Sequence, residues 1–159
     1  EDIMSNYLDL EGVLDGLFDL CKRYFGVSVT RAHDVSVWHP SVRYYNAHDN
    51  STGEYLGGFY LDPLSRPYKE GGEWVVPLLQ KREGSVKPVL VMSCYIRQGR
   101  YGNDDDNEWD KVLLRFSDVK ALFHEMGHVL EYWLAESVLV GSLSDVSCVC
   151  EDDASEFLS

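Results

Sequence analysis

The chain has 159 residues, 45% of them hydrophobic and 26% charged, which suits one globular domain with a core of its own. Its formal net charge of -13 would repel phosphate backbones, so we expect no nucleic-acid partner. No apolar run approaches the roughly 18 residues that cross a bilayer, so we expect no membrane partner either.

The first predicted element is a helix over residues 9–25. Apolar side chains recur there at intervals of three and four residues, which is typical of one buried helix face. This apolar stripe consists of Val13, Leu14, Leu17, Leu20, Cys21 and Tyr24. Gly26 ends the helix, because glycine readily takes the left-handed conformation just past a helix terminus.

Strands follow in the middle of the chain. Residues 42–49 and 54–62 flank the polar segment 50–53, whose glycine suits a hairpin loop, so we predict a β-hairpin. Residues 63–72 hold two prolines and two glycines and are interpreted as a loop. The apolar run within residues 86–96 suits a buried strand.

An acidic loop separates this strand from the last predicted helix. The run Asp104-Asp105-Asp106 lacks the alternating ligands and closing glutamate of a calcium loop, so we interpret it as a solvated charge run. Ser117 is the expected N-cap of the helix, and Asp118 in the first turn suits the positive end of its dipole. One apolar face then continues for about five turns. Its members are Val119, Leu122, Phe123, Met126, Leu130, Trp133 and Leu134.

Together these elements predict an α+β fold, mainly α with a small β-sheet. The four cysteines are too few and too scattered for a disulfide scaffold, which favours a reducing compartment. Cys21 and Cys94 lie in apolar segments, where a thiol packs as a small hydrophobe. Cys148 and Cys150 could form half of a metal site, but their spacing is shorter than zinc knuckles use, so we interpret them as ordinary thiols.

The last helix carries the chemistry. His124-Glu125-Met126-Gly127-His128 matches the pattern H-E-x-x-H. Two histidines four positions apart differ by only about 40° around a helix, so both imidazoles can reach one metal ion. Glu125, about 100° from His124, can contact a zinc-bound water without ligating the ion itself. Gly127 favours a functional site over two unrelated histidines, because a mid-helix glycine costs about 1 kcal/mol and indicates close packing.

A catalytic zinc needs a third protein ligand and an open position for water. No histidine follows His128, so a carboxylate is required. The candidates are Glu131, Glu136, Glu151, Asp152, Asp153 and Glu156. Glu131 is on the same helix, from which three ligands cannot easily close a tetrahedron, so a second element and the 151–156 cluster are preferred.

Several segments resemble the thimet oligopeptidase family of zinc peptidases, which includes oligopeptidase A and mitochondrial intermediate peptidase. They are Val37-Trp38-His39-Pro40-Ser41-Val42-Arg43, Leu56-Gly57-Gly58-Phe59-Tyr60-Leu61-Asp62, Arg66-Pro67-Tyr68-Lys69 with Gly71-Gly72, and the F-H-E-x-G-H core within residues 119–128. The resemblance covers residues 10–159 and implies a zincin-like catalytic core around the H-E-x-x-H helix.

The resemblance also implies the third ligand. The family takes it from a D-x-x-E-x-P-S segment, which resembles Asp153-Ala154-Ser155-Glu156-Phe157-Leu158-Ser159 here, so Glu156 becomes the implied ligand. Leu158 replaces the family's proline, and the interval from His128 is somewhat longer than usual, which keeps Glu151 and Asp153 as alternatives. Asp153 could instead orient a ligating histidine.

We therefore predict a zinc-dependent oligopeptidase that hydrolyses short peptides. One Zn²⁺ is expected on His124, His128 and Glu156, and Glu125 is the catalytic residue that activates the water. The alternative is a noncatalytic or pseudoenzyme fragment that retains the zinc-binding helix. A zinc enzyme acting on nonpeptide amides is a third possibility.

The ends of the chain bear on its domain organisation and location. It begins at Glu1 rather than Met and stops at Ser159 within what resembles the first turn of a helix. We therefore expect residues 1–159 to form a single partial domain, the catalytic core of a larger peptidase truncated at both ends. The expected location is intracellular, in the cytoplasm, with a mitochondrion or plastid as alternatives. The oligomeric state stays open.

Overall fold

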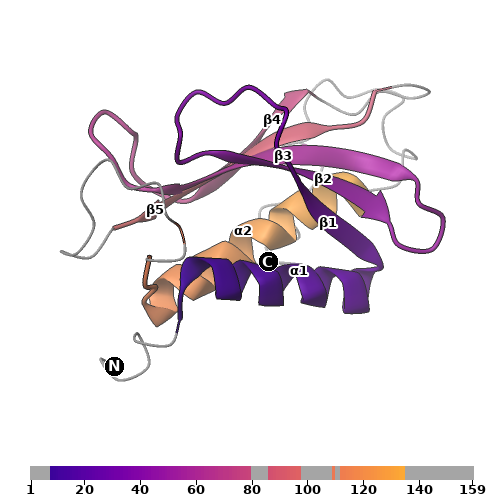
Figure 1. The fold of residues 1–159 in the computed structure, drawn as a ribbon, viewed down its shortest axis with the longest axis horizontal. Helices are drawn as coiled ribbons and strands as arrows, with labels where there is room; N and C mark the ends of the chain where they lie inside the picture. Colours follow the sequence, from indigo (N-terminus) through magenta and orange to yellow (C-terminus); the bar gives the residue numbers. More distant parts are fainter. Residues whose placement is uncertain (1–7, 80–85, 98–108, 110–111, 135–159) are drawn as a thin grey trace, which may run out of the picture.

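Two helices lie on one side of a single β-sheet (Figure 1). A computed structural model describes residues 8–79, 86–97, 109 and 112–134, and the statements below concern those residues. The helices are α1 (Leu10–Phe25) and α2 (Phe116–Leu134). The strands are β1 (Val27–Ala32), β2 (Arg43–Asp49), β3 (Tyr55–Leu64), β4 (Trp74–Leu79) and β5 (Val89–Ile96). Neither helix is long and apolar enough to cross a membrane.

The sheet has the order β1-β2-β3-β5-β4, with β3 and β5 parallel and the other neighbours antiparallel. The hairpin prediction is confirmed, because β2 pairs with β3 across the 50–53 loop. The predicted strand within residues 86–96 is confirmed as β5. Pro63, assigned to a loop from the sequence, instead lies within β3. β1 and β4 were not predicted; both lack a clean alternation of buried and exposed positions.

The α+β class is confirmed, but the expected excess of helix is not. The two helices contain 16 and 19 residues, and the five strands together contain about as many. The mainly α expectation is therefore wrong for the part of the chain that the structure describes. The sequence shows strands less clearly than helices, because a helical stripe runs over many turns and a strand spans only a few residues.

The first helix begins and ends where its sequence indicates. The Asp9 carboxylate accepts a hydrogen bond of 2.7 Å from the Gly12 N–H, which caps the helix. Gly26 follows with a φ of 66°, and its N–H donates to the Cys21 carbonyl. The buried stripe is narrower than predicted, since Leu20 and Tyr24 are 37% and 77% exposed.

The second helix starts at Phe116, two residues earlier than an N-cap at Ser117 would place it. Ser117 lies inside the first turn of α2, so its prediction as N-cap is wrong. The Asp118 carboxylate instead accepts a 2.8 Å hydrogen bond from the Arg115 N–H, while the Arg115 carbonyl accepts from the Val119 N–H. Asp118 thus satisfies a backbone donor at the helix start, and its negative charge suits the helix dipole.

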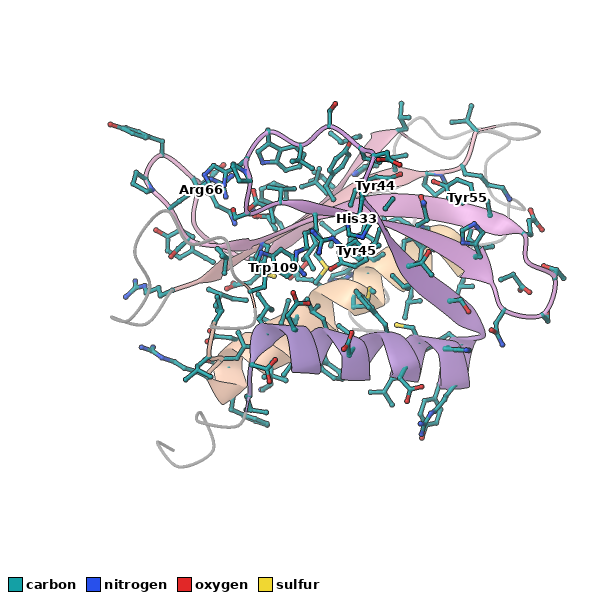
Figure 2. All side chains as sticks on the ribbon, in the orientation of Figure 1. His33, Tyr44, Tyr45, Tyr55, Arg66 and Trp109 are labelled. Carbon is teal, nitrogen blue, oxygen red and sulfur yellow. The ribbon has the colours of Figure 1, made fainter. Side chains whose placement is uncertain are left out.

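The core lies between the helices and the sheet. Tyr45 and Trp109 are buried on this side, whereas Tyr44 and Arg66 lie away from the helices (Figure 2). Trp133 of α2 packs edge-on against Phe59 of β3, with ring centroids 5.6 Å apart. A Cβ on Gly57 would come within 2.8 Å of the Trp133 indole nitrogen, so only glycine permits this approach of α2 to the sheet. Buried Cys21 and Cys94 pack as small hydrophobes, as predicted.

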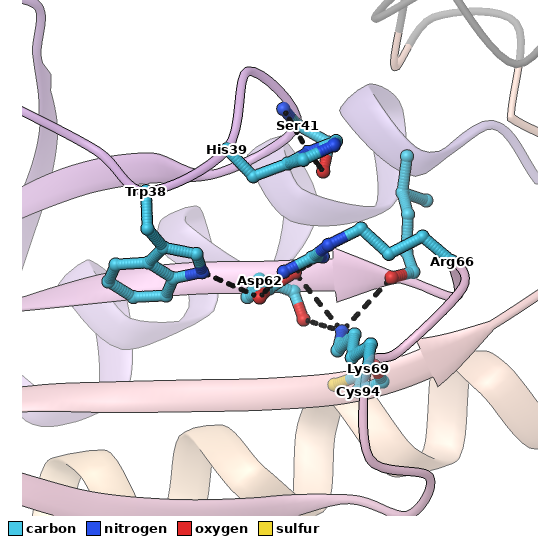
Figure 3. Close-up of polar contacts among 8 residues, drawn as sticks. Trp38, His39, Ser41, Asp62, Arg66, Lys69 and Cys94 are labelled. Atoms are coloured by element: carbon cyan, nitrogen blue, oxygen red, sulfur yellow. Dashed lines mark hydrogen bonds and ion pairs between the residues drawn. The ribbon is translucent and has the colours of Figure 1, made fainter.

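A network of charges fastens the segment after β3 to the sheet (Figure 3). Arg66 forms a bidentate pair with the Asp62 carboxylate, at 2.6 and 2.8 Å. The Lys69 ammonium donates to the carbonyl oxygens of Asp62, Leu64 and Cys94 at 2.6–3.0 Å. Burial alone would raise the pKa of Asp62, but its contacts with Arg66 and Lys69 lower it. The network joins the carboxyl ends of the parallel strands β3 and β5.

Candidate metal centre

The H-E-x-x-H sequence lies in the middle of α2. The helix turns one face toward the sheet, and its buried residues are Leu122, Glu125, Met126, Gly127, Val129, Leu130 and Trp133. Phe123 and Leu134, which were predicted on this face, are 39% and 43% exposed. His124 and His128 are half-buried at the margin of the face. Their imidazoles therefore lie between the core and the surface, where a ligand can reach them.

The two histidines converge. Their Nε2 atoms are 3.3 Å apart, and their rings stand nearly perpendicular at 89° with centroids 4.8 Å apart. Two nitrogen ligands bound at about 2.0–2.1 Å to one tetrahedral zinc ion lie about 3.3–3.4 Å apart. The separation in the structure thus fits a pair of neighbouring zinc ligands. This is the geometry that a spacing of four residues on a helix predicts.

Glu125 is more deeply buried than the two histidines. Its side chain is only 4% exposed, yet it lines the same open cleft as His124. The cleft is bounded further by Glu73, Lys120 and Ala121. A carboxylate in this position can accept a proton from a molecule bound in the cleft, as a general base must.

Cys94 of β5 lies beneath this part of the helix. Burial is the main reason that the pKa of its thiol is raised, and the negative charges of Glu125 and Glu73 add to the effect. Cys94 therefore stays a neutral thiol at physiological pH. It packs in the core beneath the site as a buried thiol.

Comparison with known proteins places this chain in a family. The sequence model of the family described as peptidase family M3 matches residues 1–157. The chain is 32% identical over 164 residues to oligopeptidase A from Salmonella typhimurium, covering 99% of this chain and 23% of that protein. The chain belongs to peptidase family M3.

Other similar M3 relatives have related names. The organellar oligopeptidase A of Arabidopsis thaliana, described as chloroplastic/mitochondrial, is 32% identical over 170 residues, which is 99% of this chain and 20% of the relative. The dipeptidyl carboxypeptidase of Escherichia coli is 32% identical over 129 residues, which is 80% of this chain and 18% of the relative. The M3 chain therefore spans less than a quarter of the length of these relatives.

The third ligand of the M3 chain stays a prediction. Glu156, Glu151 and Asp153 lie outside the described residues, as do Glu136, Asp152, the Asp104 to Asp106 run, Cys148 and Cys150. Among the residues that the structure describes, no third His, Cys, Asp or Glu side chain joins His124 and His128. The helix thus brings two imidazole nitrogens to a separation that fits zinc.

Glu131, the candidate on the same helix, faces the other nitrogen of His128. Its carboxylate is 3.9 Å from His128 Nδ1, whereas His128 Nε2 faces His124. At 3.9 Å the two groups are too far apart for a hydrogen bond, although the carboxylate lies on the Nδ1 side of the ring. Glu131 therefore lies on the side of His128 that is turned away from His124.

The sequence indicated the two histidines and Glu125 but not the opposite wall of the cleft. Glu73 stands about 50 positions earlier in the chain, just before β4, and no motif joins it to the helix. Lys120 precedes His124 by one turn and could have been placed on the same helix face. Glu73 could not, because β4 was not predicted.

Proposed function

We propose that this chain carries the zinc site of an oligopeptidase that hydrolyses short peptides. The observation that supports this most is the 3.3 Å separation of His124 Nε2 and His128 Nε2, with the buried Glu125 carboxylate lining the adjacent cleft. Membership of peptidase family M3 and the oligopeptidase names of the relatives support peptides as substrates. The predicted ligand set is His124, His128 and Glu156.

Each residue has a defined task in this proposal. Zinc supplies Lewis-acid chemistry at such sites and lowers the pKa of water from 15.7 to about 7. Glu125 accepts a proton from the attacking water and then donates it to the nitrogen of the departing amine. The burial of Glu125 holds its carboxylate in one place beside the cleft. His124 and His128 fix the site on a helix that is packed firmly on the sheet.

Some relatives are named for the cytosol and others for organelles. We propose an intracellular location for this protein, in the cytoplasm, with a mitochondrion or plastid as alternatives. Short peptides without stable structure are the proposed substrates.

The proposal predicts that Glu125→Gln in the full-length protein keeps zinc bound but lowers kcat for a quenched fluorescent peptide. General acid–base catalysis typically contributes about 10²–10⁴-fold, so a loss of that size is expected. His124→Ala and His128→Ala should instead lose zinc, measured by metal analysis after gel filtration. Unchanged turnover in Glu125→Gln would exclude the mechanism, and a wild-type protein without zinc would favour the noncatalytic alternative.

A further inference from the structure

The cleft beside the proposed zinc ligands carries two opposite charges. Its wall contains Glu73, from the segment that leads into β4, and Lys120, from the turn of α2 that precedes His124. Both side chains belong to residues that are exposed. Among the described residues, neither forms an ion pair or a side-chain hydrogen bond. Their charges are therefore available to a molecule that enters the cleft.

The backbone before β4 directs Glu73 toward the helix. Gly72 has a φ of 102°, a conformation that side chains rarely tolerate, and it turns the chain directly before Glu73. Val75, two residues later, packs against the core on the side of the sheet that carries α2. Because residues two positions apart along an extended chain face the same side, Glu73 also faces α2. This agrees with its place in the cleft beside His124 and Glu125.

The charge of Glu73 is not needed for the proposed hydrolysis. It does not join the two histidines in a metal-binding group. The proton transfer is assigned to Glu125. A carboxylate that takes no part in the proton transfer can still contact a cationic side chain of the substrate. A substrate arginine can pair with it through two parallel hydrogen bonds.

We propose that Glu73 is a specificity-determining residue that favours peptides with Lys or Arg beside the bond that is cut. The inference rests on the proposed function and deepens it by adding a substrate preference. Lys120, on the other wall, acts in the opposite sense and favours an acidic group at a separate position. The cleft thus favours peptides that carry a basic side chain at one position and an acidic side chain at another.

The test uses the full-length, zinc-loaded protein and quenched peptides that differ at one position near the scissile bond. The position is scanned, and each peptide carries Lys, Ala or Glu there. At one position the wild type should show a kcat/KM for Lys about two- to fivefold above that for Ala, as an exposed ion pair provides. Glu73→Gln should bring this ratio to about one, and Glu73→Lys should make Glu preferred over Lys. The ratio should also fall as the salt concentration rises.

Matched controls separate a local contact from a general effect of charge. Glu70→Gln removes the same charge from an exposed residue three positions away that does not line the cleft, and it should keep the wild-type ratio. Lys120→Met should remove the preference for Glu at the separate position that Lys120 favours, while the Lys preference set by Glu73 stays. An unchanged ratio in Glu73→Gln, or an equal loss in Glu70→Gln, overturns the inference.

A binding measurement distinguishes this inference from the proposed function. In the Glu125→Gln background, fluorescence anisotropy with labelled Lys and Ala peptides should give the same preference, and adding Glu73→Gln should remove it. If the wild type shows no chelator-sensitive cleavage, the proposed function fails, and the binding ratio alone then decides the role of Glu73. Equal affinities for the two peptides would contradict that role.

Discussion

At the scale of single residues, the approach of His124 to His128 was predictable, because a regular helix fixes the geometry. The spacing of His124 and His128 predicts convergence on one ion, and their Nε2 atoms lie at a distance that zinc requires. Burial of Glu125 was not evident, because a charged residue is rarely placed in a core from its sequence alone. Glu73 could not be foreseen, since only the order of the strands brings it to the cleft.

Asp49 is another residue whose role follows from local geometry. Its carboxylate accepts hydrogen bonds from the Ser51 hydroxyl and N–H and from the Thr52 N–H and hydroxyl at 2.6–3.0 Å. These bonds, that from the Ser51 hydroxyl first, lower the pKa of Asp49 from 3.8 to about 2. The ionised Asp49 carboxylate thus holds the loop of the β2–β3 hairpin in place.

This lowered pKa predicts a pH-dependent contribution to stability. A depressed folded-state pKa means that the contribution is complete above the unfolded value of 3.8 and is lost as the pH falls toward about 2. Asp49→Asn should therefore lower the urea midpoint of the full-length protein at pH 7. The difference from the wild type should shrink between about pH 4 and pH 2. A difference that stays constant or grows in acid would contradict the assignment.

At the scale of elements, the two helices show what a periodic pattern can and cannot specify. The apolar stripe and Gly26 predicted both ends of α1 to within one residue, because capping and burial act within a few turns of the chain. The stripe of α2 did not reveal how deeply the helix would sit on the sheet. That depth depends on Gly57, a residue of β3, which leaves room for Trp133.

Two glycine substitutions should have opposite effects on the free energy of unfolding. Gly57→Ala should lower the free energy of unfolding by about 1–3 kcal/mol, because its Cβ would meet the Pro88 carbonyl at 2.5 Å and Trp133 at 2.8 Å. Gly16→Ala, in the exposed face of α1 with nothing within 4 Å, should instead stabilise by about 0.5–1 kcal/mol. Urea denaturation measures both. Equal changes in the free energy of unfolding for the two variants would show that the packing of Trp133 does not require a glycine at position 57.

At the scale of the whole molecule, the sequence specified the classes of elements better than their assembly. The hairpin and β5 were predictable from short apolar segments and a polar loop. The parallel pairing of β3 with β5 and the position of β4 beyond β5 depend on contacts between distant segments. The Lys69 ammonium illustrates this, since it joins carbonyl groups of both parallel strands. Such long-range contacts leave no periodic pattern in the sequence.

We propose above that His124 and His128 hold one zinc ion together. Zinc analysis of the full-length protein combined with X-ray absorption at the zinc edge tests it most directly. We expect about one zinc per chain, with two imidazole nitrogens at about 2.0–2.1 Å and oxygen as the remaining ligands. Zinc should be lost in His124→Ala and in His128→Ala. A metal-free protein, or zinc whose spectrum keeps both imidazoles in either variant, would contradict the claim.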